Sequence, residues 1–348
     1  MTEHPRPRLV RSARDPALGA RITRRVAMHY ADGADAGTDR PAFVRAASSM
    51  AWLGDRIAMV QDDVNFVALV DPTTGLADAI TLPAGKDDLR QFDDGRGNKK
   101  YKFDFEAMAR VPTPGGTTLL AFGSGSKKRR ENVLVLQVSG PASESRAHVP
   151  QIVPLPELYA TLRAAGEFSG SDMNIEGAVY VDGMIRLFGR GNGASRGDVV
   201  PLDATCDIGW SALRAHIDRR DAASVPSLSR ITQYDLGAID GVRLGFTDAI
   251  PLSRTTLLYS AAAEASEDAR NDGAVVGSAI GIMPHDRRRE GRWAGLLDEE
   301  GRPFGGKVEG LVRHRHDPSR ALVVIDVDDH TRPSELCDVA LSGPWFGA

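Results

Sequence analysis

The stretch that decides the fold runs from residue 103 to residue 138 and reads FDFEAMARVPTPGGTTLLAFGSGSKKRRENVLVLQV. Three short runs rich in Val, Leu, Ala and Phe are separated by a Pro-Gly-Gly turn and by a basic loop. Runs of this length, bounded by turn residues, are typical of antiparallel β-strands rather than helices. The stretch therefore predicts a meander of strands that carries one acidic residue, Glu106, near the start of its first strand.

The same order of strand, turn, strand and polar cluster recurs along the chain. It appears again around Glu176, Asp248 and Glu309, at steps of about 60 to 70 positions, and once without the acid between residues 48 and 82. Internal repeats of short strands are the sequence signature of a β-propeller. The repeat predicts an all-β fold in which each module forms one blade.

We expect a single β-propeller domain over residues 1–348, because a ring of four-stranded sheets leaves only short, protected edges. Five blades are favoured and six are possible. The last module has three clear strands, so an N-terminal strand around Arg8–Arg11 is expected to complete it. Two segments, 155–168 and 210–220, have helix-forming composition and are interpreted as insertions between strands. The expected blades cover residues 45–85, 100–157, 172–237, 242–298 and 304–348.

The strand order predicts that the recurring acids share one site. In an antiparallel blade, the start of the first strand lies beside the end of the second strand. The acids begin first strands, and polar clusters end second strands at 62–65, 124–130, 190–192, 264–267 and 326–329. All of them should therefore meet at one mouth of a central channel.

Four carboxylates around a narrow channel repel one another and need neutralisation by a cation or by basic side chains. Oxygen ligands without cysteine favour Ca²⁺ or Mg²⁺ over zinc, so Glu106, Glu176, Asp248 and Glu309 are candidate metal ligands. The alternative is that these acids bind backbone amides of neighbouring blades and hold the blades together. The sequence leaves both interpretations open.

Several short motifs resemble bacterial propeller proteins grouped as phytase-like or esterase-like. They are Asn174-Ile-Glu-Gly, Arg190-Gly-Asn, Phe246-Thr-Asp, Asp272-Gly-Ala-Val-Val-Gly-Ser-Ala-Ile-Gly and Lys307-Val-Glu-Gly. The resemblance covers the chain from about residue 45 onward and implies a propeller that cleaves phosphoesters or other esters. The dense acidic cleft of calcium-dependent propeller phytases has no residue-by-residue match in this sequence.

The predicted function is a metal-dependent hydrolase that acts on a small anionic substrate at the channel mouth. Glu176, Glu309 and Arg190 are the candidate catalytic residues. Lys127, Lys128, Arg129 and Asn192 are the candidate substrate-binding residues, because basic side chains neutralise phosphate or carboxylate groups. Two alternatives stay open: a non-catalytic scaffold or ligand-binding propeller, and a lactonase or sugar-directed enzyme.

Composition and charge exclude several other classes. The chain has 43 Lys and Arg against 47 Asp and Glu, which argues against a nucleic-acid binder that depends on general charge. No apolar run approaches the length of a membrane span and the N-terminus lacks a signal-peptide pattern, so a cytoplasmic location is expected. Cys206 and Cys337 lie far apart and predict neither a disulfide framework nor a zinc site.

Overall fold

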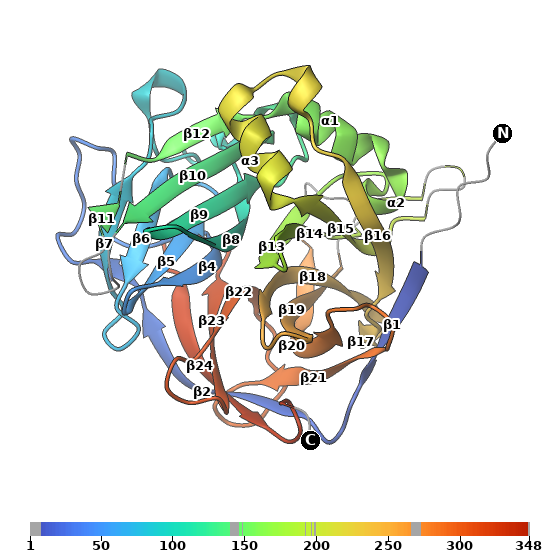
Figure 1. Ribbon diagram of the computed structural model, residues 1–348. Helices are drawn as coiled ribbons and strands as arrows, with labels where there is room; N and C mark the ends of the chain where they lie inside the picture. Colours follow the sequence, from blue (N-terminus) through green and yellow to red (C-terminus); the bar gives the residue numbers. More distant parts are fainter. Residues whose placement is uncertain are drawn as a thin grey trace.

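The computed structural model describes residues 8–139, 146–147, 149–191, 193–195, 197, 200–265 and 273–346. Within this part of the chain the fold is mostly β, and the strands form five antiparallel meanders arranged around a common centre (Figure 1). We number these meanders as sheets I to V in chain order of their first strands.

Each of the first three sheets is built from strands that are consecutive in the sequence. Sheet I contains β4 (Ala47–Leu53), β5 (Arg56–Gln61), β6 (Phe66–Val70) and β7 (Leu76–Thr81), with β3 (His29–Tyr30) added beside β7. Sheet II contains β8 (Phe105–Thr113), β9 (Gly116–Gly123) and β10 (Asn132–Ser139), which pairs with both β11 (Arg146–Ala147) and β12 (Gln151–Pro154). Sheet III contains β13 (Ile175–Val181), β14 (Met184–Gly189), β15 (Asp203–Gly209) and β16 (Leu228–Asp235).

The last two sheets repeat the pattern. Sheet IV contains β18 (Val242–Pro251), β19 (Thr256–Ala265), β20 (Ala274–Pro284) and β21 (Gly291–Leu297), preceded by the short β17 (Ala238–Ile239). Sheet V contains β22 (Lys307–Arg313), β23 (Arg320–Asp326), β24 (Glu335–Ser342) and β2 (Gly19–Ala27). The strand modules expected from the sequence are thus present.

The first strands of the five sheets pack side by side in a ring. β4 lies against β8, β8 against β13, β13 against β18, β18 against β22, and β22 returns to β4. Large apolar clusters fill the space between neighbouring sheets, for example around Phe246 between sheets III and IV. This arrangement is propeller-like, and it brings the starts of all five first strands to the centre of the molecule.

An N-terminal strap, residues 8–27, joins three sheets at their outer edges. In β1 (Arg8–Arg14), Arg8–Arg11 pair in parallel with β16, and Ser12–Arg14 pair in parallel with β21. β2 then pairs antiparallel with β24 and becomes the fourth strand of sheet V. An N-terminal strand does add to sheet V, but the expected segment was wrong: Arg8–Arg11 pair with β16 of sheet III, and β2 takes the place beside β24.

The two predicted helical insertions are present beside sheets II and III. They form α1 (Pro156–Ala164), α2 (Gly166–Ser169) and α3 (Trp210–Arg219). Short 3₁₀ turns lie at Lys86–Asp88, Lys99–Tyr101, Lys128–Arg130 and Ala222–Ser224. Cys206 and Cys337 are both buried with free thiols, as expected. Among the described helices, none has the length and apolarity needed to cross a membrane.

Candidate functional site

Three of the four recurring acids sit on β-bulges in the first strands of their sheets. The strand register shifts at Glu106 in β8, at Glu176 in β13 and at Glu309 in β22, so each glutamate is an extra residue opposite its partner strand. A bulge turns a side chain away from the regular alternation of a strand. All three glutamates line one cavity at the mouth, the face where first strands begin and second strands end.

Asp248 does not share this position. In β18 the bulge falls on Thr247, and Asp248 is the residue after it. Ser48 lies at the corresponding bulge of β4 and lines the same cavity as the glutamates, whereas Asp248 does not. The prediction that the four acids occupy equivalent places was therefore wrong for Asp248, because the module was aligned one residue out of register.

Asp248 lies at the centre of the ring and links three first strands. Its Oδ2 accepts hydrogen bonds from the Ser49 hydroxyl in β4, at 3.1 Å, and from the Leu311 amide in β22, at 3.2 Å. Its Oδ1 accepts one from the Ala249 amide at 2.8 Å. Burial raises the pKa of this carboxyl well above its usual value, despite these hydrogen bonds. For Asp248 the contacts are those of a residue that holds neighbouring sheets together.

On one side of the mouth, buried acids alternate with buried bases. We call this set the paired side: Glu176, Arg190, Glu264, Lys307 and Glu309. The Arg190 guanidinium lies 3.0 Å from Glu264 Oε2 and 3.7 Å from Glu176 Oε1. Lys307 Nζ lies 2.8 Å from Glu309 Oε1 and 3.5 Å from Glu264 Oε2. Both cations bridge two glutamates, so the charges of this side largely compensate one another.

The pKa values on the paired side are pushed apart. Burial raises the pKa of Glu176 to about 8, although Arg190 and Lys307 oppose the shift. At Glu264 burial also acts upward, but Arg190, Lys307 and the Gly273 amide hold the pKa below its usual value. Asn174 donates a hydrogen bond of 2.6 Å to Glu176 Oε1. The pKa of Glu176 therefore lies above neutral pH, and the pKa of Glu264 lies below its usual acidic value. Such a separation of pKa values within one network is typical of acid–base sites.

On the other side of the mouth lies an acidic triad formed by Asp62, Asp104 and Glu106. One carboxylate oxygen from each lies within 4.8 Å of the other two. Lys102 forms ion pairs with Asp62 and with Asp104, the latter at 2.7 Å, and Arg130 lies 2.7 Å from Asp104. Among the described residues, Glu106 makes no hydrogen bond or ion pair with a partner. Burial, with Asp104 and Asp62 nearby, raises the pKa of Glu106 well above its usual value.

The backbone around the triad is held in an unusual conformation. Asp104, two residues before the Glu106 bulge, has φ of 63°, and Ala46, two residues before the corresponding bulge in sheet I, has φ of 47°. An L-residue with positive φ costs free energy, especially alanine, and such residues gather at functional sites. At Asp104 this conformation directs the carboxylate toward Lys102, Arg130 and the Ser124 hydroxyl.

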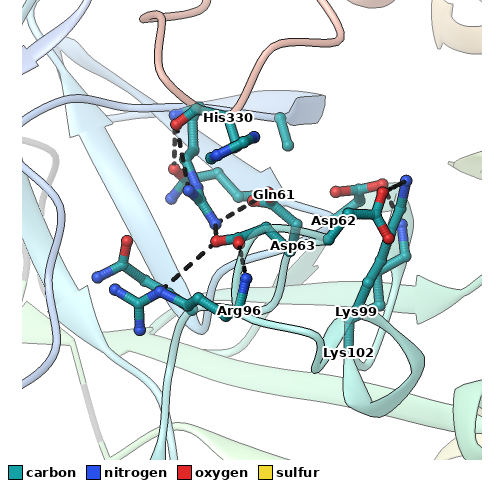
Figure 2. Close-up of polar contacts among 12 residues, drawn as sticks. Gln61, Asp62, Asp63, Arg96, Lys99, Lys102 and His330 are labelled. Atoms are coloured by element: carbon teal, nitrogen blue, oxygen red, sulfur yellow. Dashed lines mark hydrogen bonds and ion pairs between the residues drawn. The ribbon is translucent and has the colours of Figure 1, made fainter.

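Beside the triad lies a larger cavity of about 460 Å³, which shares Asp62 with it. Figure 2 labels several of the residues that line this cavity. Asp62 turns toward Lys99 and Lys102, while the next residue, Asp63, turns toward the opposite side, where Arg45 lies 3.1 Å from its Oδ2. The cavity extends to His330 in the loop that follows β23. Both cavities share Asp62, Lys99, Lys102, Asp326 and Asp328 in their linings.

The residues predicted to bind substrate are only partly brought to the mouth. Lys127 and Arg190 line the smaller cavity. Lys128 and Arg129 line neither cavity, and Arg129 instead lies over the Tyr101 ring at 4.5 Å from its centroid. Asn192 lies outside the described residues. Convergence of the second-strand clusters is confirmed for Asp62, Glu264 and Asp326, which all line the mouth.

Several mouth residues were not predicted from the sequence. Lys102 and Asp104 lie in the loop before β8, where no periodic pattern distinguishes them from other polar loop residues. Lys307 and Asn174 each lie two residues before a bulged glutamate, as Asp104 does before Glu106. Spacing relative to the recurring acid was therefore a usable signal for these positions.

Comparisons with solved structures give distant likenesses. Glutaminyl cyclase of Myxococcus xanthus is 10% identical, with a TM-score of 0.43, over 96% of this chain and 98% of that one. The catalytic domain of a Coprinopsis cinerea GH62 α-L-arabinofuranosidase is 12% identical, with a TM-score of 0.40, over 93% and 96%. A Dyadobacter fermentans protein of unknown function is 11% identical, with a TM-score of 0.38, over 94% and 100%.

No curated protein matches the sequence. One family model does, and it covers residues 43–341, from just before β4 of sheet I into β24 of sheet V. The chain belongs to the family of unknown function DUF6929.

Proposed function

We propose that this protein is a five-bladed β-propeller hydrolase that cleaves phosphoester or other ester substrates at the mouth, with a Ca²⁺ or Mg²⁺ ion held by the acidic triad. The observation that carries the proposal is Glu106, a glutamate with no described partner beside two further carboxylates within 4.8 Å. Unpaired buried carboxylates are costly, so they are retained where they bind or react.

The donor chemistry of the triad fits a hard cation. All three ligands are carboxylate oxygens, which suit Ca²⁺ and Mg²⁺. The Lys102 ammonium already contacts Asp62 and Asp104, so a metal would have to bind on the Glu106 side of the triad or displace Lys102. The triad supplies only part of the shell of about six to eight oxygens that Ca²⁺ takes, which leaves room for water and substrate. The four predicted ligands are thereby revised to one of them, Glu106, together with Asp62 and Asp104.

When bound, the metal would polarise the substrate and lower the pKa of a water molecule. The protein's own residues supply the remaining functions. Lys127, Arg130 and Arg190 line the same cavity and can neutralise an anionic group of the substrate. Glu176, with its pKa of about 8, is protonated at neutral pH and can donate a proton to a leaving group. Glu309, held by Lys307, completes the wall of the cavity.

A second candidate is a sugar-directed or lactone-cleaving enzyme. It is favoured by the pKa values of the carboxyl groups at the mouth, without a metal. Glu106 and Glu176 both have raised pKa values, while Asp104 and Glu264 have lowered ones. A protonated and an ionised carboxyl in one site are the elements of acid–base hydrolysis without a metal. Activity that survives complete chelation would favour this candidate over the metal-dependent one.

The first experiment measures metal binding through thermal unfolding. A ligand that binds only the folded state stabilises it by about 2.7 kcal/mol at a hundredfold excess over Kd. We expect Ca²⁺ or Mg²⁺ to raise the Tm of the wild type, and Glu106→Gln to abolish the rise. Glu309→Gln should keep it, because Glu309 is already paired with Lys307. Glu157→Gln, on α1 and far from the mouth, is the matched control.

The second experiment is a screen of phosphoester, carboxylester, lactone and glycoside substrates with the same variants, with added metal and with chelator. Turnover that requires metal and is lost in Glu106→Gln supports the proposal. Identical melting curves with calcium, magnesium and chelator, together with no turnover, would overturn it and leave a ligand-binding or scaffold protein.

A further inference from the structure

The larger cavity beside the triad has an acidic lining, of which the proposed reaction uses only Asp62. We call it the acidic pocket, and its carboxylates come from three separate segments of sheets I and V and the loop between β7 and β8: Asp62, Asp63, Asp93, Asp94, Asp326, Asp328 and Asp329. Lys99 and Lys102 are the lysines of the lining, and His330 closes it on one side (Figure 2). Its volume of about 460 Å³ is in the range of small-molecule sites.

Internal partners account for part of this charge. Arg45 bridges Asp63 and Asp93, at 3.1 Å and 3.0 Å. Lys99 lies 3.2 Å from Asp94, and Arg96 lies 3.6 Å from Asp93. Apart from Asp328, the six carboxylates of the lining therefore face four cationic side chains among the described residues, including Lys102, which Asp104 shares. Negative charge remains in excess.

Two carboxyls identify where the excess lies. Asp63 is 8% exposed, and its Oδ1 is buried with no hydrogen-bond partner, while Oδ2 is bound by Arg45. Asp326, at the end of β23, makes no hydrogen bond or ion pair with any described residue, and it lines both cavities. Asp326 is only partly buried, so its carboxylate can accept hydrogen bonds from a ligand in the cavity, and such a ligand would also offset the negative charge beside the buried Asp63.

The bases of the mouth are placed away from this pocket. Lys127, Arg130, Arg190 and Lys307 line the smaller cavity and not the acidic pocket. The mouth thus has two different ends: the smaller cavity, where these four bases from sheets II, III and V lie among carboxylates, and the acidic pocket, where carboxylates predominate. A ligand complementary to both ends carries an anionic group and a cationic group.

We propose that the acidic pocket binds the ammonium group of an organic substrate, so that the hydrolase acts on an ester that also carries a positively charged amine. The inference rests on the proposed function for the reaction and goes beyond it in naming the substrate class. An ammonium offers three donors, which suit several carboxylate oxygens spread over a wide pocket. A metal ion alone would leave most of a cavity of this size to water.

The test uses binding, so that it does not depend on turnover. The probe is 1,4-diaminobutane, with 1,4-butanediol as the neutral analogue of the same length, each added to the full chain during thermal unfolding. We expect the diamine to raise the Tm by several degrees and the diol to leave it unchanged. Asp326→Asn should lose most of that rise, and Asp55→Asn, an exposed change in the β4–β5 turn, should keep it. Asp63→Asn serves as the second variant if Asp326→Asn does not fold.

This design distinguishes a failure of the proposed metal site from a failure of the proposed ammonium site. Glu106→Gln should keep the response to the diamine while it loses the response to metal, and Asp326→Asn should show the reverse. Equal melting curves with diamine and diol would overturn the inference and leave the proposed reaction standing. A Ca²⁺ or Mg²⁺ response that is lost in Asp326→Asn and kept in Glu106→Gln would also overturn it, because the pocket would then be the metal site.

Discussion

The two sides of the mouth differ in how their buried carboxylates are compensated by cationic side chains. On the paired side, Arg190 and Lys307 each bridge two glutamates, and each of these three glutamates has a cation within 3.7 Å. On the opposite side, Glu106 and Asp326 lie among other carboxylates without a described partner. Both sets occupy equivalent strand ends, so the repeat alone does not decide the difference. The two sides differ in whether a basic residue occupies one of two positions. These positions are two residues before the bulged residue, where Lys307 lies, and the end of the second strand, where Arg190 lies.

This difference separates residues that hold the mouth together from residues that are free to bind. A buried ion pair contributes little net stability, but removing one partner leaves the other charge uncompensated. An unpaired carboxyl, in contrast, has no protein partner to lose. The following predictions use this contrast.

The largest effect is expected for Arg190→Ala on the paired side. The substitution leaves Glu176 and Glu264 short of their shared cation, and breaking a buried pair costs about 3–5 kcal/mol. Urea unfolding monitored by fluorescence would measure it. Arg302→Ala is the control, because its side chain is 71% exposed and its surface pairs contribute at most about 1 kcal/mol. A loss for Arg190→Ala as small as for the control would remove the distinction between the two sides.

A comparable loss is expected for Asp248→Ala, below the mouth. The change leaves the Leu311 amide and the Ser49 hydroxyl without their acceptor, at about 1–3 kcal/mol for each buried group. Asp248→Asn should cost less, because the amide oxygen can still accept the hydrogen bonds from Ser49 and Leu311, and because burial raises the pKa of Asp248 and so already disfavours its charged form. Calorimetry of both variants would show whether their order is reversed, which would contradict a linking role.

The pH dependence of stability should reveal Glu176. Its folded-state pKa of about 8 is above the ordinary value of 4.5, so the folded protein binds the proton more tightly than the unfolded chain does. The contribution of Glu176 to the free energy of unfolding is therefore largest below about pH 4.5, and it decreases as the pH rises to about 8. Between pH 7 and pH 9 the loss is about 1.4 kcal/mol, from one unit of pKa. Glu176→Gln should flatten this part of a Tm–pH curve, and an unchanged slope would contradict the raised pKa.

The smallest effects on stability are expected for Glu106→Gln and Asp326→Asn without added ligand. Neither carboxyl has a described partner, so each amide should change the free energy of unfolding by no more than about 0.5 kcal/mol or raise it slightly. Differential scanning fluorimetry at pH 7 is sufficient. A loss comparable to that of Arg190→Ala would show that these carboxyls have structural partners after all.

Much of the fold was predictable because each sheet is local in sequence. Strand, turn and strand follow one another within each module, so the pattern of apolar runs determines the pairing. The N-terminal strand was misplaced for the opposite reason, since β2 pairs with β24 across the whole chain. Its signal was present: in Gly19–Ala27, buried Ala20 and Ile22 alternate with arginines on the exposed face.

The site was predictable in its location and less so in its composition. The repeated glutamates located the mouth because strand direction places them there. The bulge at Thr247 moved Asp248 out of the set, since one extra residue reverses which side of a strand a side chain faces. Lys102 and Asp104 depend on the path of a loop, which local sequence patterns do not determine.

The N-terminal strap has a consequence for how the molecule is made. β2 ends at Ala27 and leaves the ribosome long before its partner β24, which begins at Glu335. β1 likewise cannot pair until β16 and β21 have been synthesised. During translation these early segments expose unpaired strand edges, which are prone to association with other chains. Closing the ring is then a late step of high sequence separation, and such steps are slow. A circular permutant that begins at residue 28 and joins the strap after residue 346 would make these pairings local and should close its ring faster.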